Sequence, residues 1–186
     1  LPLNIFEPRY LNMVADAMGS HRMFGMLQPD ASRPDQPEAV YCTGCAGRIT
    51  TYQETPDGRI ELILTGVCRF NIHQELAGTR GYRIVVPDWE PYRTDYVEPG
   101  MHSVEHRDRL IYLLKNYFNT TRLETDWKTV MRIPPDRLVN TLTTLLPLSG
   151  LEKQAILEAV SPQERVDTLI SALEMQVHEP PATPRH

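Results

Sequence analysis

The chain has 186 residues, of which 41% are hydrophobic and 23% are charged, as is ordinary for a soluble globular protein. Its formal net charge of −5 disfavours nucleic acid as a partner, because cationic contacts to phosphate dominate that affinity. No apolar run approaches the roughly 18 residues of a membrane span, so we expect no membrane partner.

The first twenty residues predict an extended segment and a helix with a sharp corner between them. Residues 1–6 form a short apolar entry. Pro8 suits the first helical position, where its missing N–H would be unpaired anyway. Glu7 then takes the N-cap, at the positive end of the helix, and Gly19 ends the helix.

The following part of the chain predicts many short strands separated by turn signals. A surface loop is expected at residues 28–38, and Thr55-Pro56-Asp57-Gly58 is typical of a tight turn. Many short strands favour a small sandwich or barrel. The predicted strands cover residues 22–27, 45–52, 59–65, 68–73 and 82–86.

From residue 103 the apolar period becomes helical, which predicts a helical bundle after the β part and hence an α+β fold. Two capping boxes mark helix starts, Ser149 with Glu152 and Ser161 with Glu164. The tail at residues 179–186 is predicted to be disordered. Helices are expected near residues 103–118, 125–131 and 138–145 and after each capping box.

The stretch Pro2-Leu3-x-Ile5-Phe6-Glu7-Pro8-Arg9-Tyr10 resembles the signature of the N-terminal, substrate-binding domain of Lon proteases. Later segments agree with that family in the same order, and the resemblance covers residues 1–177. These segments are Gly44 to Ile49, Asp57-Gly58-Arg59, Leu64-x-Gly66-x-x-Arg69-Phe70-x-Ile72, and Tyr82 to Tyr92. The resemblance implies a structural signature of Phe6, Glu7, Pro8, Arg9, Tyr10, Gly66, Arg69 and Phe70.

The resemblance implies a PUA-like β-barrel over residues 1–98 and a helical bundle over residues 101–178. It further implies a free-standing, non-catalytic module that recognises unfolded or specific client polypeptides. Such a module is expected to act as an adaptor or regulator of proteolysis, with a full-length ATP-dependent protease as a further partner.

Enzymatic activity is not expected from this chain. A phosphate-binding loop needs closely spaced glycines before a lysine, and none of Lys115, Lys128 and Lys153 follows such a loop. The Ser–Lys pair of the family's peptidase is also missing, because the serines here lie at cap or loop positions. We therefore predict no catalytic residue and no cofactor.

The three cysteines, an odd number, argue against a disulfide framework and favour a reducing, cytoplasmic location. Cys42-Thr43-Gly44-Cys45 has the spacing of a zinc knuckle or a redox pair, but a structural zinc site needs four ligands and no second pair exists. His102 and His106 share a helix face without the Glu of a catalytic zinc motif. We predict no metal site.

Two alternatives to polypeptide recognition remain open, binding of RNA and binding of a small ligand by the β part. Four arginines in or beside the strands are available to form a basic strip. Pairing of these arginines with Glu61 and Glu75 is the simpler interpretation, and the net charge opposes RNA. The arginines are Arg48, Arg59, Arg69 and Arg83.

Trp89, Tyr92 and Tyr96 form an aromatic cluster in the segment between the two parts. Aromatic residues are enriched at binding hot spots, so these three are the candidate protein-binding residues, at a cleft between barrel and bundle. The same residues would equally serve to pin the connecting segment to the barrel.

Overall fold

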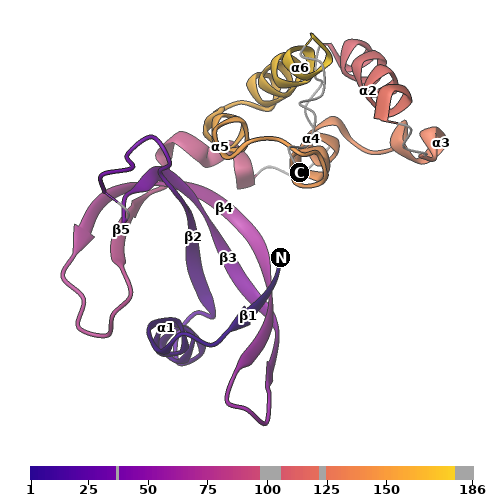
Figure 1. Cartoon of the computed structure of the whole chain (residues 1–186). Coiled ribbons are helices and arrows are strands. Elements are labelled where there is room, and N and C mark those ends of the chain that lie inside the picture. Colours follow the sequence, from indigo (N-terminus) through magenta and orange to yellow (C-terminus); the bar gives the residue numbers. More distant parts are fainter. Residues whose placement is uncertain (37, 97–105, 122–124, 179–186) are drawn as a thin grey trace, which may run out of the picture. The chain divides into compact units, whose positions relative to one another are not determined.

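The computed structural model describes residues 1–36, 38–96, 106–121 and 125–178 (Figure 1). The chain divides into two compact units, Leu1–Tyr96 and Val97–His186. An antiparallel sheet forms the first unit and helices form the second, so the predicted α+β class is confirmed. The predicted boundary at residues 98–101 and the predicted disordered tail lie outside the described residues.

In the described residues, the first unit is built on a five-stranded antiparallel sheet of order β1-β4-β3-β2. β5 pairs with the second half of β4, on the edge that β1 occupies at the first half. The pairings of the described residues do not join β2 to β1 or β5, so the closed, PUA-like barrel stays a prediction. The strands are β1 (Pro2–Ile5), β2 (Met23–Pro29), β3 (Val40–Glu54), β4 (Ile60–Leu76) and β5 (Ile84–Asp88).

β4 is one continuous strand where the sequence pattern predicts two, at residues 59–65 and 68–73. Ala46 of β3 pairs with Cys68, whereas the next residue, Gly47, pairs with Gly66. Val67 is therefore an extra residue in β4, a β-bulge that changes the outward face of the strand without ending it. The sequence pattern loses its alternation at the bulge, although the backbone pairing continues.

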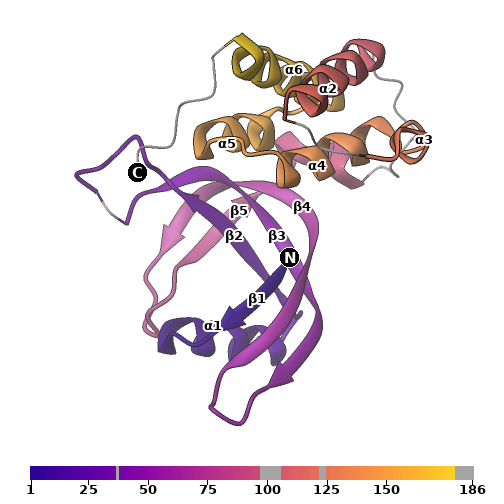
Figure 2. The same ribbon diagram turned by 45° about the vertical axis from the view of Figure 1, so that its right-hand side comes forward.

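Helix α1 (Pro8–Met18) begins at Pro8 with Glu7 as its N-cap residue, as predicted. The Glu7 side chain makes no capping hydrogen bond, and it instead accepts one from Arg9 Nε at 2.9 Å. Figures 1 and 2 show the curved strands bending around α1. The apolar face of the helix packs into a core formed by Val14, Ala17, Ile49, Ile60, Leu62 and Leu64.

The second unit is a group of helices around one apolar core (Figure 2). α6 is central to it, because α2, α4 and α5 all pack against α6. The helices are α2 (Arg107–Thr121), α3 (Trp127–Val130), α4 (Pro135–Leu145), α5 (Gly150–Glu158) and α6 (Pro162–His178). The most deeply buried core residues are Leu110, Leu114, Leu138, Val139, Val166, Leu169 and Leu173. Within the described ranges, none of the helices has the length and apolar character needed to cross a membrane.

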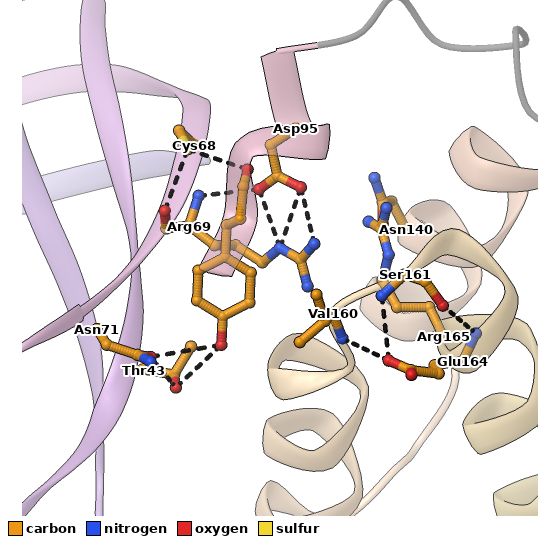
Figure 3. A network of polar contacts seen from close by, with 11 residues as sticks. Thr43, Cys68, Arg69, Asn71, Asp95, Asn140, Val160, Ser161, Glu164 and Arg165 are labelled. Atoms are coloured by element: carbon orange, nitrogen blue, oxygen red, sulfur yellow. Dashed lines mark hydrogen bonds and ion pairs between the residues drawn. The ribbon is translucent and has the colours of Figure 1, made fainter. Parts of the chain in front are cut away.

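Both predicted capping boxes form. Ser149 Oγ accepts a hydrogen bond from the backbone N–H of Glu152 at 3.2 Å, and the Glu152 carboxylate accepts one from the Ser149 N–H at 2.6 Å. The reciprocal contacts of Ser161 and Glu164 both measure 3.1 Å (Figure 3). Four helix-end N–H groups are thereby satisfied, which sets where α5 and α6 begin.

Replacing Ser161 by Ala should lower the free energy of unfolding of the second unit by about 1 kcal/mol, the usual cost of losing an N-cap side chain. Thermal or urea unfolding followed by circular dichroism measures this change. Ser171→Ala is the matched control, because Ser171 lies exposed within α6 and donates only to the Asp167 carbonyl. An equal loss in both variants would contradict the assigned role of the Ser161 cap.

Candidate recognition site

The three predicted recognition residues lie on or beside one short segment, the 3₁₀ helix η1 (Glu90–Tyr96), which follows β5. Their environments differ sharply. Trp89 is half-buried, with its ring centroid 5.5 Å from that of Phe70. Tyr92 is 3% exposed, whereas Tyr96 is 63% exposed. The segment therefore presents one aromatic side chain fully and a second one partly.

A buried ion pair attaches η1 to β4 (Figure 3). The Arg69 guanidinium donates to both oxygens of Asp95, with Nη2–Oδ1 at 2.7 Å and Nε–Oδ2 at 2.9 Å. The backbone N–H of Arg69 donates to the same carboxylate at 3.0 Å. The two side chains are only 5% and 12% exposed. Because both side chains are buried, losing either partner would remove charge-assisted hydrogen bonds that water is not placed to replace.

Tyr92 is held by the strands below it. Its ring lies 4.4 Å from the Arg69 guanidinium, and its hydroxyl is 3.3 Å from Thr43 Oγ1 and 3.4 Å from Asn71 Oδ1. Thr43 belongs to β3, while Arg69 and Asn71 belong to β4. The contacts of Tyr92 thus fix the position of η1, which is the alternative role that the sequence allowed for the aromatic cluster.

Cys68 lies on the inner side of this arrangement and is buried. Its thiol donates to the Arg69 carbonyl at 3.1 Å. Burial raises the pKa of the Cys68 thiol, and the hydrogen bond to that thiol raises the pKa of Tyr96. Most of the Tyr96 side chain stays open to solvent.

The signature residues divide into an interior group and a surface group. Phe70 is 2% exposed, and a Cβ at Gly25 would lie 2.8 Å from its ring, so that position requires glycine. Phe6, by contrast, is 60% exposed. The Arg59 guanidinium lies 5.7 Å from the centre of the Phe6 ring. In the exposed part of the first turn of α1, the Arg9 guanidinium lies 4.7 Å from the Tyr10 ring. Sequence reasoning could not separate these two groups.

The arginines of the predicted basic strip mostly neutralise neighbouring carboxylates. Arg59 pairs with Asp57 at 2.9 Å, and Arg83 pairs with Glu75 at 3.3 Å, the second of these as predicted. The predicted pairing of an arginine with Glu61 is wrong, because the residues opposite Glu61 on the neighbouring strands are the amides Asn4 and Gln53. Arg69 pairs with Asp95, as described above. Arg48 Nη2 contacts the sulfur of Met23 at 3.7 Å. Such pairing leaves little uncompensated positive charge to attract a phosphate backbone.

Among the residues that the structure describes, the cysteines and histidines do not gather at one point. Cys42 is exposed and Cys45 half-buried, and all three cysteines are free thiols. In the part of the chain that the structure describes, no three His, Cys, Asp or Glu side chains are placed to hold a metal ion. His106 Nδ1 lies 2.9 Å from Asp167 Oδ1, and that hydrogen bond lowers the pKa of Asp167. His102 lies outside the described residues.

The chain matches the family model described as the ATP-dependent protease La (LON) substrate-binding domain, over residues 1–175. It belongs to this family. The Lon protease of Heliobacterium modesticaldum is 28% identical to this chain over 95% of the chain's length. The Lon protease of Bacillus thuringiensis is 24% identical over 85% of the chain's length. The matched regions make up 22% and 20% of those proteases. The chain thus spans about a fifth of the length of the relatives it matches.

Two solved structures share the fold of this LON domain. One is the Lon N-terminal domain protein from Xanthomonas campestris, with a TM-score of 0.66 and 21% identity over 92% of this chain and 88% of that one. The other is the N-terminal domain of the Mycobacterium avium complex Lon protease, with a TM-score of 0.63 and 17% identity over 94% and 90%. At these identities the likeness shows the fold alone.

Replacing Asp95 by Ala should lower the free energy of unfolding of the first unit by about 3–5 kcal/mol, because the buried Arg69 guanidinium would lose the carboxylate that also accepts its backbone N–H. Urea unfolding followed by tryptophan fluorescence measures the loss, since Trp89 packs beside η1. Arg93→Ala is the control: it breaks the exposed Glu90–Arg93 pair and should cost less than about 1 kcal/mol. Similar small losses in both variants would show that the Asp95 contact is dispensable.

The three thiols should react with an alkylating reagent at clearly different rates at neutral pH. Cys42 should react first because it is exposed. Cys45 and Cys68 should react slowly, because burial raises the pKa of both thiols and the thiolate is the reacting form. Mass spectrometry of timed samples, with urea-unfolded protein as the reference, measures the order. Fast labelling of Cys68 in the folded protein would contradict the burial of η1 against β4.

Proposed function

We propose that this LON domain recognises polypeptides and contributes substrate binding to ATP-dependent proteolysis. The observation that carries the proposal is the family match over residues 1–175, whose description is a substrate-binding domain. The curated relatives are Lon proteases, and the description of the family names an ATP-dependent protease. The matched region is a binding domain, which supports a role in recognition without chemistry of its own.

The geometry of η1 supports an aromatic contact as part of the mechanism. The Arg69–Asp95 pair and the buried Tyr92 hold the backbone of η1, so Tyr96 is presented from a fixed position. A rigid aromatic side chain loses little conformational entropy on binding and offers a large contact area. Trp89 can add its exposed edge, whereas Tyr92 serves to position the segment. Contacts of this kind suit weak binding to many different clients.

The proposal extends to the partners of the domain. Its ligands are unfolded or specific client polypeptides. Its further partner is a full-length ATP-dependent protease in the cytoplasm, which would degrade the bound polypeptides. The domain would act there as an adaptor or regulator of proteolysis. RNA binding is not favoured, because three of the four strand arginines already pair with carboxylates.

A labelled, permanently unfolded polypeptide should bind the purified chain saturably at both low and high salt, since the contacts are mainly apolar. Tyr96→Ala should weaken binding about five- to tenfold, equivalent to about 1 kcal/mol or slightly more. Fluorescence anisotropy measures the dissociation constant. Trp89→Ala should also weaken binding, but its packing on Phe70 means that folding must be checked first.

Tyr112→Ala is the matched control, because Tyr112 is 64% exposed in the second unit and belongs to no part of the proposed site. This variant should bind as the native chain does. Absence of binding by the native chain would overturn polypeptide recognition. Binding that is insensitive to Tyr96→Ala would leave recognition standing and remove η1 from it.

A further inference from the structure

A shallow groove of about 380 Å³ crosses the outer face of the sheet in the first unit, over β1, β4 and β3. It lies on the side of the sheet opposite to the core, because its outward side chains alternate with buried residues such as Leu62 and Leu64. The outward residues that line it are Pro2, Asn4, Thr51, Gln53, Glu61 and Ile63.

Strand register arranges these side chains in two rows. In the first row, Asn4 of β1 and Gln53 of β3 both pair with Glu61 of β4, so a carboxylate lies between two amides. In the second row, Pro2 and Thr51 flank Ile63, which is 43% exposed. The groove therefore offers a charged, hydrogen-bonding row beside an apolar one. These pairings join three strands of one sheet.

The Glu61 carboxylate faces solvent without an ionic partner among the described residues. Several other carboxylates of the first unit form ion pairs: Glu7 with Arg9, Asp57 with Arg59, and Asp95 with Arg69. An exposed anion between two amide side chains attracts a cation that can also make hydrogen bonds, such as a lysine ammonium or an arginine guanidinium.

We propose that this groove binds an extended polypeptide segment that carries Lys or Arg at one position and an aliphatic residue two positions away. Glu61 and Ile63 are themselves two residues apart on one face of β4, a separation of about 7 Å. An extended segment lying along β4 repeats that spacing, so its cation meets Glu61 while its aliphatic side chain meets Ile63. The occupant is a polypeptide, and in this respect the inference rests on the proposed function.

The next row along β4 adds a preference at one more position of the segment. There Arg48 of β3 pairs with Thr65 of β4 and is exposed. A second cation, two positions beyond the aliphatic residue on the side away from the first cation, would approach the Arg48 guanidinium. The segment should therefore be neutral or acidic at that position, which distinguishes this groove from a site for generally basic chains.

Short fluorescent peptides that differ only at the recognised positions test the groove by anisotropy with the whole 186-residue chain. A peptide containing Lys-Ser-Leu should bind about fivefold more tightly than one containing Glu-Ser-Leu, in line with the strength of an exposed ion pair. Changing the spacing to Lys-Leu-Ser should remove the advantage. Glu61→Gln should remove it as well, and Glu61→Lys should reverse the preference toward the Glu-Ser-Leu peptide.

Asp35→Asn is the control variant, because it removes the same charge from an exposed loop outside the groove, and it should bind as the native chain does. Ile63→Thr keeps the strand and should weaken both peptides alike. Equal binding of the Lys and Glu peptides, or an unchanged preference in Glu61→Gln, would overturn the proposal that the groove binds this segment. If unfolded polypeptide still binds through Tyr96, only the groove proposal falls; if no polypeptide binds, the proposed function falls with it.

Discussion

The buried pair of Arg69 and Asp95 is the constraint on which the end of the first unit depends. A guanidinium that is almost fully removed from water must be paired, and Asp95 pairs it while also accepting the backbone N–H of Arg69. Because the carboxylate contacts side chain and backbone of one residue, η1 has a single defined position on β4. That position places the Tyr92 ring against the Arg69 guanidinium and the Trp89 ring against Phe70.

The same constraint decides which aromatic residues are free to bind another molecule. Tyr92 points inward and completes a polar cluster with Thr43 and Asn71, whereas Tyr96 at the end of η1 faces solvent. β4 also supplies Glu61 and Ile63 to the groove on the outer face. One long strand thus positions both proposed polypeptide contacts, one near its start and the other near its middle. The bulge at Val67 lies between Ile63 and Arg69, and it changes which side chains of β4 point outward on either side of it.

Local sequence signals were sufficient for most elements of the fold. Pro8 at the start of α1 and the Ser161 capping box depend on neighbouring residues only, so they could be predicted residue by residue. The continuity of β4 was missed, because an extra residue in a strand breaks the alternation of side chains without breaking the backbone ladder. For the candidate site, the sequence indicated an aromatic segment, but it could not show that Tyr92 is interior and Tyr96 exposed.

The sequence by itself determined the α+β class, the positions of the helices and the family, because propensity, capping and motif order are written in residues close together along the chain. Only the tertiary structure decided the partners of Arg69 and Glu61. Arg69 pairs with the carboxylate of Asp95, and Glu61 is flanked by Asn4 and Gln53. Such partners are set by strand register and by burial, which join residues far apart in the sequence, and these contacts decide which side chains remain available to bind.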